Sequence, residues 1–317
     1  MNNKFKVKDY QNKISSGQFN DCFVYGLRAN HGGFNTAEVA DNNATVFAGD
    51  IRSGKSNACF FAIFTHFLSD GHRSLYVLID TKQDLKEFSE LKEKDNFVFV
   101  REEEKIEALF KDLFLELSGR AELFHKSSCH DLKAYERKTG NSITRLVIVV
   151  ENLLSIYRIF SKNKTNINET DISRILRIGR NYGIYFLGVF DTRDTEIVKN
   201  DELPHDFNRF FSRRHVFRTS NAKFCRNFIK HTSPTLIKQE EPWKAYNEWE
   251  EVFFPFITRN IQRRLLKINK QEFKINTQHI ALDIFRKAYS YNSSARVKKC
   301  DCHIVTLMRT GCKCGGI

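Results

Sequence analysis

Long apolar runs are absent from this sequence of 317 residues. None reaches the roughly 18 residues that a membrane-spanning helix needs, so we expect no membrane span. Residues 1–12 are polar and lack the apolar core of a secretory signal peptide. Cysteines are sparse before residue 300, and Cys22, Cys59, Cys129 and Cys225 lie scattered, as is typical of a reducing compartment. We therefore expect a cytoplasmic protein.

Acidic residues are under-represented as well. Asp and Glu number 38 against 51 Lys and Arg, which gives a net charge of +13 and a pI near 9.3. This balance favours a polyanionic partner, nucleic acid before a membrane, because no basic segment carries a lipid-facing apolar stripe. The alternative is that lysine-rich coding alone makes the chain basic. The length suits one large α/β domain with appendages, or two domains.

Residues 49–56 match the phosphate-binding pattern G-x-x-x-x-G-K-[ST] without a mismatch. A β-type run, 45–48, precedes them and a helix-like run, 57–68, follows. A Gly-rich turn could match by chance, but the strand-loop-helix context argues against it. The sequence therefore predicts a P-loop that binds a nucleotide through Gly49, Asp50, Ile51, Arg52, Ser53, Gly54, Lys55 and Ser56.

Each residue type in the loop has a physical role. The two glycines let the backbone curl so that N–H groups point at the phosphates, and the following helix adds the positive end of its dipole. Lys55 is expected to reach the β- and γ-phosphates, and Ser56 to hold Mg²⁺. ATP and Mg²⁺ are therefore the expected ligands.

Two continuous apolar runs, 74–80 and 145–152, end at the acids Asp80 and Glu151. Such runs are typical of buried parallel strands, and the acids fall at the edge where open α/β sheets bind ligands. A further strand is predicted over 184–190. The same reading predicts a strand over 96–100, helices over 83–95, 171–180 and 259–274, and a long amphipathic region over 102–139. This alternation predicts a mostly parallel, doubly wound sheet with helices on both faces.

Basic and aromatic residues alternate over 205–230. Such a pattern can follow a phosphate backbone. Equally, it can be an ordinary strand and helix whose phenylalanines face the core and whose arginines face water. Both interpretations remain open at this point.

The order of these segments resembles the FtsK/HerA superfamily of ring-forming, DNA-pumping ATPases. The counterparts of its motifs are the P-loop at 49–56, an Asp-Pro-Lys-like motif at 78–82, the Walker B strand at 147–152, an Arg-rich helix at 175–184 that leads into the sensor strand 186–193, and the following strand at 216–220. The resemblance covers about residues 44–230. It implies a RecA-like P-loop NTPase fold, a ring of six subunits, and double-stranded DNA as the partner.

This chain departs from the family at the catalytic positions. Glu151-Asn152 stands where the family has Asp-Glu. Glu151 could still hold Mg²⁺, whereas Asn152 cannot accept a proton from the attacking water, although it could orient that water. A one-residue slip would instead make Glu151 the base and leave no Walker B aspartate. Either interpretation argues against fast hydrolysis. Thr192 occupies the sensor position, where the family has Gln.

Arg177 and Arg180 lie on the helix that faces a neighbouring subunit in the superfamily. The resemblance implies that one of them acts in trans on the phosphate that is being transferred, and Arg180 is the preferred candidate from its place in the motif. The alternative is a salt bridge far from the phosphate.

The last residues contain two C-x-C pairs, Cys300 with Cys302 and Cys312 with Cys314. Four thiolates, or three with His303, could hold a tetrahedral Zn²⁺. Redox disulfides and free thiols are the alternatives. Because a basic linker precedes the pairs, as in nucleic-acid-contacting knuckles, we favour zinc.

These observations divide the chain into an N-terminal segment (1–38), a P-loop ATPase motor domain (39–232), a helical C-terminal extension (233–296) and a Cys-rich tail (297–317). We expect an ATP-driven DNA translocase for viral genome packaging, which the size favours, or for plasmid or conjugative transfer. Its further partner would be a capsid or transfer-channel protein, in bacterial or host cytoplasm or with a virion. One alternative is a nucleotide-gated DNA-binding or scaffold protein with little hydrolysis, and another is an ATPase that acts on protein partners.

Overall fold

The computed structural model describes residues 12–13, 16–29, 33–38, 44–81, 86–91, 94, 96–156, 169–193 and 211–268. Their strands are β1 (Cys22–Arg28), β2 (Phe34–Glu38), β3 (Ala44–Gly49), β4 (Ser74–Ile79), β5 (Phe97–Val100), β6 (Arg145–Val150), β7 (Ile184–Asp191), β8 (Arg213–Val216), β9 (Lys244–Tyr246) and β10 (Glu251–Phe253). Their α-helices are α2 (Lys55–Asp70), α3 (Glu103–Lys126), α4 (Leu132–Thr139), α6 (Glu169–Ile178), α9 (Ala222–Ile229) and α10 (Arg259–Ile268). The 3-10 helices are η2 (Gly71–Arg73), η3 (Lys86–Leu91), η4 (Gly179–Tyr182) and η5 (Ser233–Leu236).

The described strands form one ten-stranded sheet in the order β2-β1-β10-β9-β8-β3-β7-β6-β4-β5. From β8 to β5 all neighbours are parallel, so their carboxyl ends share one edge. The strand that leads into the P-loop, β3, lies between β7 and β8, which puts the loop in the ligand-binding crevice of an open α/β sheet. The predicted α/β fold with a mostly parallel sheet is confirmed.

The remaining strands extend the sheet with antiparallel pairs, β8 with β9, β9 with β10, β10 with β1 and β1 with β2. They come from the predicted N-terminal segment and from the predicted helical extension, and the sequence analysis expected no strand in either. Both β9 and β10 contain only three residues. A segment that short shows too little alternation to be recognised from sequence.

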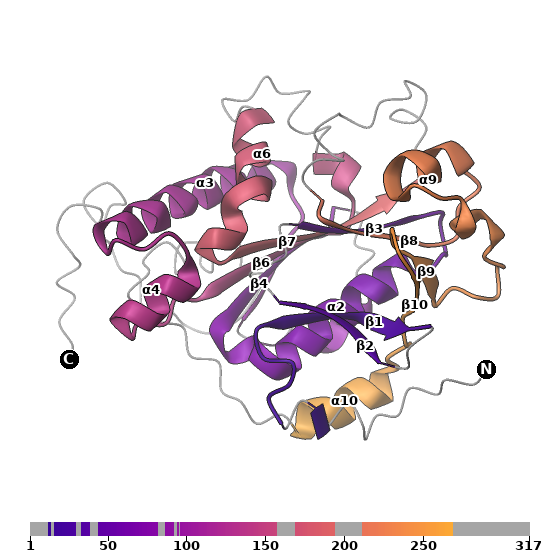
Figure 1. The fold of residues 1–317 in the computed structure, drawn as a ribbon, viewed down its shortest axis with the longest axis horizontal. Helices are drawn as coiled ribbons and strands as arrows, with labels where there is room; N and C mark the ends of the chain where they lie inside the picture. The colour runs from indigo at the N-terminus through magenta and orange to yellow at the C-terminus, as the bar shows by residue number, and fades with distance from the viewer. Residues whose placement is uncertain are drawn as a thin grey trace.

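Helices cover both faces of the sheet (Figure 1), with α3, α6 and α9 on one face and α2 and α10 on the other. Side chains of successive residues in a strand point to opposite faces of the sheet. Val46 and Ala48 pack under α3, α6 and α9, whereas Phe47 packs on the α2 side. Because both faces are buried, the parallel strands read as continuous apolar runs rather than as alternating ones.

Several predicted helices differ in their bounds. The described part of 83–95 is a 3-10 helix, η3, and the region 102–139 divides into α3 and α4. The break follows Ser128, which has a φ of +51°, and α4 then starts at an Asp131 side chain that accepts a hydrogen bond from the Ala134 N–H at 2.7 Å. An N-cap of this kind fixes a new helix start. The helix predicted over 259–274 is α10, and residues 269–274 lie outside the described ranges.

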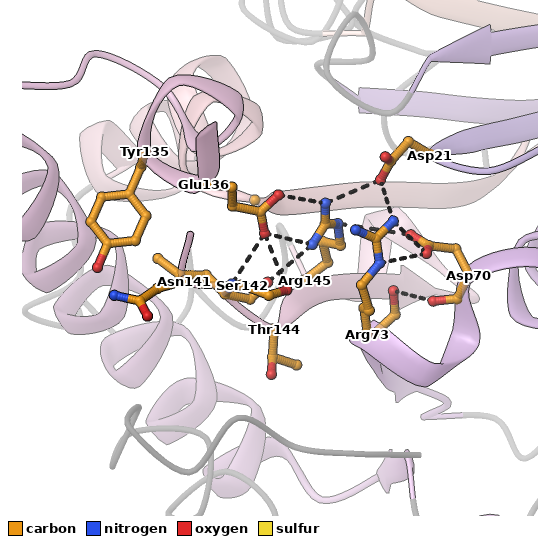
Figure 2. Close-up of polar contacts among 12 residues, drawn as sticks. Asp21, Asp70, Arg73, Tyr135, Glu136, Asn141, Ser142, Thr144 and Arg145 are labelled. Carbon is orange, nitrogen blue, oxygen red and sulfur yellow. Dashed lines mark hydrogen bonds and ion pairs between the residues drawn. The ribbon is translucent and has the colours of Figure 1, made fainter. Parts of the chain in front are cut away.

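An ionic cluster ties four elements together at the amino-terminal edge of the sheet (Figure 2). Arg145, which begins β6, is only 4% exposed, and it donates to Asp21 Oδ1 at 3.1 Å and to Glu136 Oε1 at 2.9 Å. Arg73 donates to the same oxygen of Asp21 at 3.1 Å and to Asp70 Oδ1 at 2.8 Å. The cluster therefore connects β6 with the residue before β1, the end of α2 and the helix α4.

Arg145→Met is expected to destabilise the fold by about 3 kcal/mol, because it leaves the buried carboxylate of Asp70 with less compensating charge. Urea unfolding measures this loss. Lys126→Met is the matched control, because the Lys126–Glu122 pair is about two-thirds exposed on both sides and should matter little. Equal effects of the two substitutions would contradict the role of the cluster.

A second buried feature lies beside the P-loop strand. The His215 ring on β8 stacks against Tyr25, with ring centroids 5.2 Å apart, and against Phe47, with centroids 5.4 Å apart. Neither ring nitrogen has a hydrogen-bond partner among the described residues. Burial lowers the pKa of His215 to about 3, and Arg213 adds to the effect. Burial likewise lowers the pKa of His66 to about 3.

These two histidines predict the pH dependence of stability. In the unfolded chain histidine takes up a proton near pH 6.5, whereas in the folded chain these two do so only near pH 3. The contribution of these two neutral histidines to the free energy of unfolding is therefore intact above about pH 6.5, and it is lost as the pH falls toward 3. From pH 7.5 to 5.5, each should cost about 1.4 kcal/mol of unfolding free energy. In urea unfolding at both pH values, His215→Phe should remove one of these two losses, and His130→Gln, at an exposed position, should remove neither.

Candidate nucleotide-binding site

The P-loop connects β3 to α2, as predicted. Gly54 has a φ of +101°, and a Cβ atom there would lie 1.7 Å from the carbonyl oxygen of Pro242. At Gly49 a Cβ would lie 2.9 Å from Phe217 Cβ. Only glycine fits these two close approaches, because any side chain would meet backbone or packed atoms. Both glycines of the P-loop pattern are therefore required by the packing around the loop.

A segment from beyond β8 packs against the loop, which the sequence analysis missed. Besides the Pro242 carbonyl at Gly54, the Pro255 carbonyl accepts a hydrogen bond from Asn57 Nδ2 at 3.3 Å. In both contacts the distant segment contributes a backbone carbonyl, and Asn57 and Pro255 are 198 residues apart in the sequence. Composition and spacing carry no signal for such contacts.

Lys55 begins α2 and is largely buried. Its Nζ donates a hydrogen bond to the backbone oxygen of Asp50 at 2.7 Å. Burial lowers the pKa of Lys55. The carboxylates of Asp191, Asp50 and Glu151 act in the opposite direction, so the ammonium group lies in a field of three acids. Ser56 follows in the first turn of α2 and is half-buried.

Glu151 and Asn152 follow β6 at the same sheet edge as the P-loop. The Glu151 N–H donates to Ile79 O at 3.0 Å, which continues the pairing of β6 with β4. The Asn152 side-chain oxygen accepts a hydrogen bond from the Leu154 N–H at 3.1 Å. This leaves the amide nitrogen of Asn152 as the group suited to orient a water.

Thr192 follows β7 and is bonded to the P-loop. Its hydroxyl donates to Asp50 Oδ1 at 2.7 Å and lies 2.7 Å from the Thr219 hydroxyl. Thr219 also donates to Asp50 Oδ1, at 3.1 Å, and the Ser220 N–H donates to Asp50 Oδ2 at 3.1 Å. We call Asp50, Thr192, Thr219 and Ser220 the Asp50 clamp. Asp50 and Thr192 are predicted site residues, whereas Thr219 and Ser220 were predicted only as part of the strand at 216–220.

A further carboxylate near α2 belongs to the Glu87-Phe88 step that follows the Asp-Pro-Lys-like motif in the sequence. Glu87 lies on η3, and one of its oxygens is buried with no hydrogen-bond partner among the described residues. Burial raises the pKa of the Cys59 thiol on α2, and the charges of Glu151 and Glu87 raise it further. Both acids therefore lie within electrostatic reach of the P-loop helix.

The structure does not bring Arg180 to the P-loop of its own chain. Arg180 lies on η4, just before β7 begins, and Thr192 lies after β7 ends. The two residues are therefore at opposite edges of the sheet. A role at a phosphate would have to be exercised on another subunit. Arg177 lies on α6 with its side chain exposed.

The remaining expectations are only partly covered by the described residues. For 211–230, the phenylalanines at 211, 217, 224 and 228 are buried, and Lys223, Arg226 and Lys230 are exposed, as in an ordinary strand and helix. Residues 205–210 and Cys300, Cys302, Cys312 and Cys314 lie outside the described ranges. Within those ranges, no three His, Cys, Asp or Glu side chains are grouped as metal ligands, so zinc remains a prediction. No described helix has the length and apolarity to cross a bilayer.

Solved structures show the same fold. The conjugation coupling protein TcpA of pCW3, in its monomer form with ATPγS, is 18% identical with a TM-score of 0.62, over 79% of this chain and 71% of that one. EssC (ATPases 2 and 3) from Geobacillus thermodenitrificans is 15% identical with a TM-score of 0.63, over 81% of this chain and 51% of that one. The cytoplasmic domain of the Thermomonospora curvata type VII secretion ATPase EccC is 16% identical with a TM-score of 0.59, over 77% of this chain and 31% of that one.

No family model and no curated protein sequence matches the chain. The structural likeness, at identities below 20%, defines the class: this chain has the fold of a P-loop ATPase. The P-loop ATPase fold that the resemblance to the FtsK/HerA superfamily implied is confirmed. ATP binding is supported by the P-loop and by the ATPase structures that share the fold.

Gly54→Ala should lower the affinity for MgATPγS by at least about tenfold. The new Cβ would meet the Pro242 carbonyl and would force a left-handed backbone on alanine. Isothermal titration calorimetry measures the affinity. Gly119→Ala, inside α3 with open space around the glycine, is the control and should bind like wild type. Unchanged binding by Gly54→Ala would rule out a phosphate cradle at this loop.

Proposed function

We propose that this protein is an ATP-driven motor that moves double-stranded DNA as a ring of subunits, six in the family pattern. The observation that carries the proposal is the glycine cradle with Lys55 at the carboxyl edge of the parallel strands. The net charge of +13 supports a polyanionic substrate. The fold shared with a conjugation coupling protein supports DNA transfer.

The residues at this edge fit a magnesium-bound triphosphate. Both glycine positions exclude a side chain, and the buried ammonium group of Lys55 supplies the positive charge that the β- and γ-phosphates need. In this proposal Ser56 and Glu151 hold Mg²⁺, which when bound neutralises charge on those phosphates. Asn152 orients the attacking water, and Arg180 approaches the phosphate of the adjoining subunit.

The DNA in this proposal is a viral genome during packaging or a plasmid during transfer. Packaging would call for a capsid protein as partner. Transfer would call for a channel protein instead. The protein would work in bacterial or host cytoplasm, or attached to a virion.

A second candidate has a specific observation in its favour. EssC and EccC also share the fold, and EccC is a secretion ATPase. The motor would then act on a protein. The two candidates differ in what stimulates the ATPase and in how steeply binding weakens with salt, because neutralised DNA phosphates release counterions.

Phosphate release with and without duplex DNA tests the proposal. We expect DNA to raise the rate, Lys55→Ala to lower it by about 100-fold or more because it removes positive charge at the phosphates, and Glu151→Gln to lower it comparably because it removes a carboxylate that would hold Mg²⁺. Lys126→Ala, at an exposed position on α3, is the control.

Three results would point elsewhere. A rate that ignores DNA, with a shallow salt dependence of DNA binding, would favour the protein substrate. Retention of ATPγS with almost no turnover would favour a nucleotide-gated scaffold. A wild-type protein that binds no nucleotide would overturn both motor proposals.

A further inference from the structure

Three of the four residues of the Asp50 clamp are almost fully buried, and Ser220, which contributes its backbone N–H, is exposed. Asp50 is 6% exposed, Thr192 1% and Thr219 2%. A buried carboxylate is stable only when its oxygens receive hydrogen bonds or a counter-charge. Here three donors from the ends of two different strands meet one side chain of the P-loop. The second position of the P-loop pattern does not itself require an acid, so the phosphate cradle alone does not explain Asp50.

The backbone of Asp50 is equally engaged. Its N–H donates to Arg218 O at 2.9 Å, and its carbonyl accepts from the Ser53 N–H at 3.2 Å and from Lys55 Nζ at 2.7 Å. On the other side, the Thr192 N–H donates to Gly49 O at 3.1 Å. The same residue therefore holds the turn of the loop, the lysine and both flanking strands.

Counting protons limits what Thr192 can do. Each threonine hydroxyl has one proton, and the Asp50, Thr192 and Thr219 oxygens make three contacts of 2.7 to 3.1 Å. The Thr192 hydroxyl donates to Asp50 Oδ1, and the Thr219 hydroxyl donates its own proton either to Asp50 or to Thr192. In both arrangements the hydroxyl proton of Thr192 stays within the clamp. With these hydrogen bonds in place, the Thr192 hydroxyl has no proton to donate to a γ-phosphate.

We infer that Asp50, Thr192 and Thr219 are positioning residues that fix the P-loop for the phosphates common to ATP and ADP. This deepens the proposed function, on which it rests for nucleotide binding. In this arrangement Thr192 acts through Asp50 and not by contact with the γ-phosphate. The distinction is measurable, because a contact to the γ-phosphate affects ATP alone.

The test measures the affinities of wild type and variants for MgATPγS and MgADP by calorimetry, well below the unfolding temperature. Thr192→Val and Thr219→Val each keep the shape and remove the hydroxyl, and each should weaken both nucleotides by about tenfold and by equal factors. Thr192→Ser keeps the hydroxyl and should stay within about twofold of wild type. In an Asp50→Ala background, Thr192→Val should have little further effect, because the two side chains act as one unit.

Thr45→Val is the matched control. Thr45 is buried at the other end of β3, and its hydroxyl is 2.8 Å from the Tyr25 hydroxyl. The same substitution there should lower thermal stability and leave both affinities unchanged. A purely structural clamp would behave in the same way, so its variants would lose stability and keep their affinities.

Each other outcome has a clear reading. Loss of MgATPγS affinity alone in Thr192→Val would overturn the inference and make Thr192 a γ-phosphate sensor. Wild-type affinities in both valine variants would overturn it as well. Equal losses for the two nucleotides in a protein whose ATPase ignores DNA would support the clamp and overturn the DNA motor.

Discussion

The site depends on how closely the β3 strand is held between two parallel neighbours. The loop that follows β3 has backbone hydrogen bonds on both sides, from Asp50 to Arg218 and from Thr192 to Gly49. Glycine at positions 49 and 54 makes room for packing from the β8 side and from the segment at Pro242. These contacts fix the backbone of the loop at both of its glycines and at Asp50.

One helix connects this loop to the opposite edge of the sheet. The first residue of α2 is Lys55 and the last is Asp70, which pairs with Arg73 in the ionic cluster. A carboxylate at a helix C-terminus is unfavourable toward the helix dipole, so the arginines offset both its burial and its position. Apolar burial on nearly every side of α2 leaves the helix little freedom to move by itself. A movement of α2 at its P-loop end would therefore also move Asp70 at its other end, which belongs to the ionic cluster that joins β6 and α4.

The sequence was sufficient for the features that depend on local pattern. The P-loop, the buried strands that end at Asp80 and Glu151, and the strand after Gly183 follow from residue types and spacing, because each is one short segment with its own signal. The three-residue strands β9 and β10 have no such signal, since their partners determine them. The same holds for the clamp. Asp50 and Thr219 are 169 residues apart, and nothing near either one indicates that they meet.

The pair Glu151-Asn152 limits the chemistry that this edge can perform. Because the Asn152 oxygen accepts from the Leu154 N–H, the side chain presents a donor, and a donor can hold a water but cannot take its proton. A proton acceptor must then be a carboxylate. Glu151 is one, and Asp50, Asp191 and Glu87 are others whose charges act on side chains of the P-loop helix. Any proton transfer at this edge would therefore fall to one of these carboxylates and not to position 152.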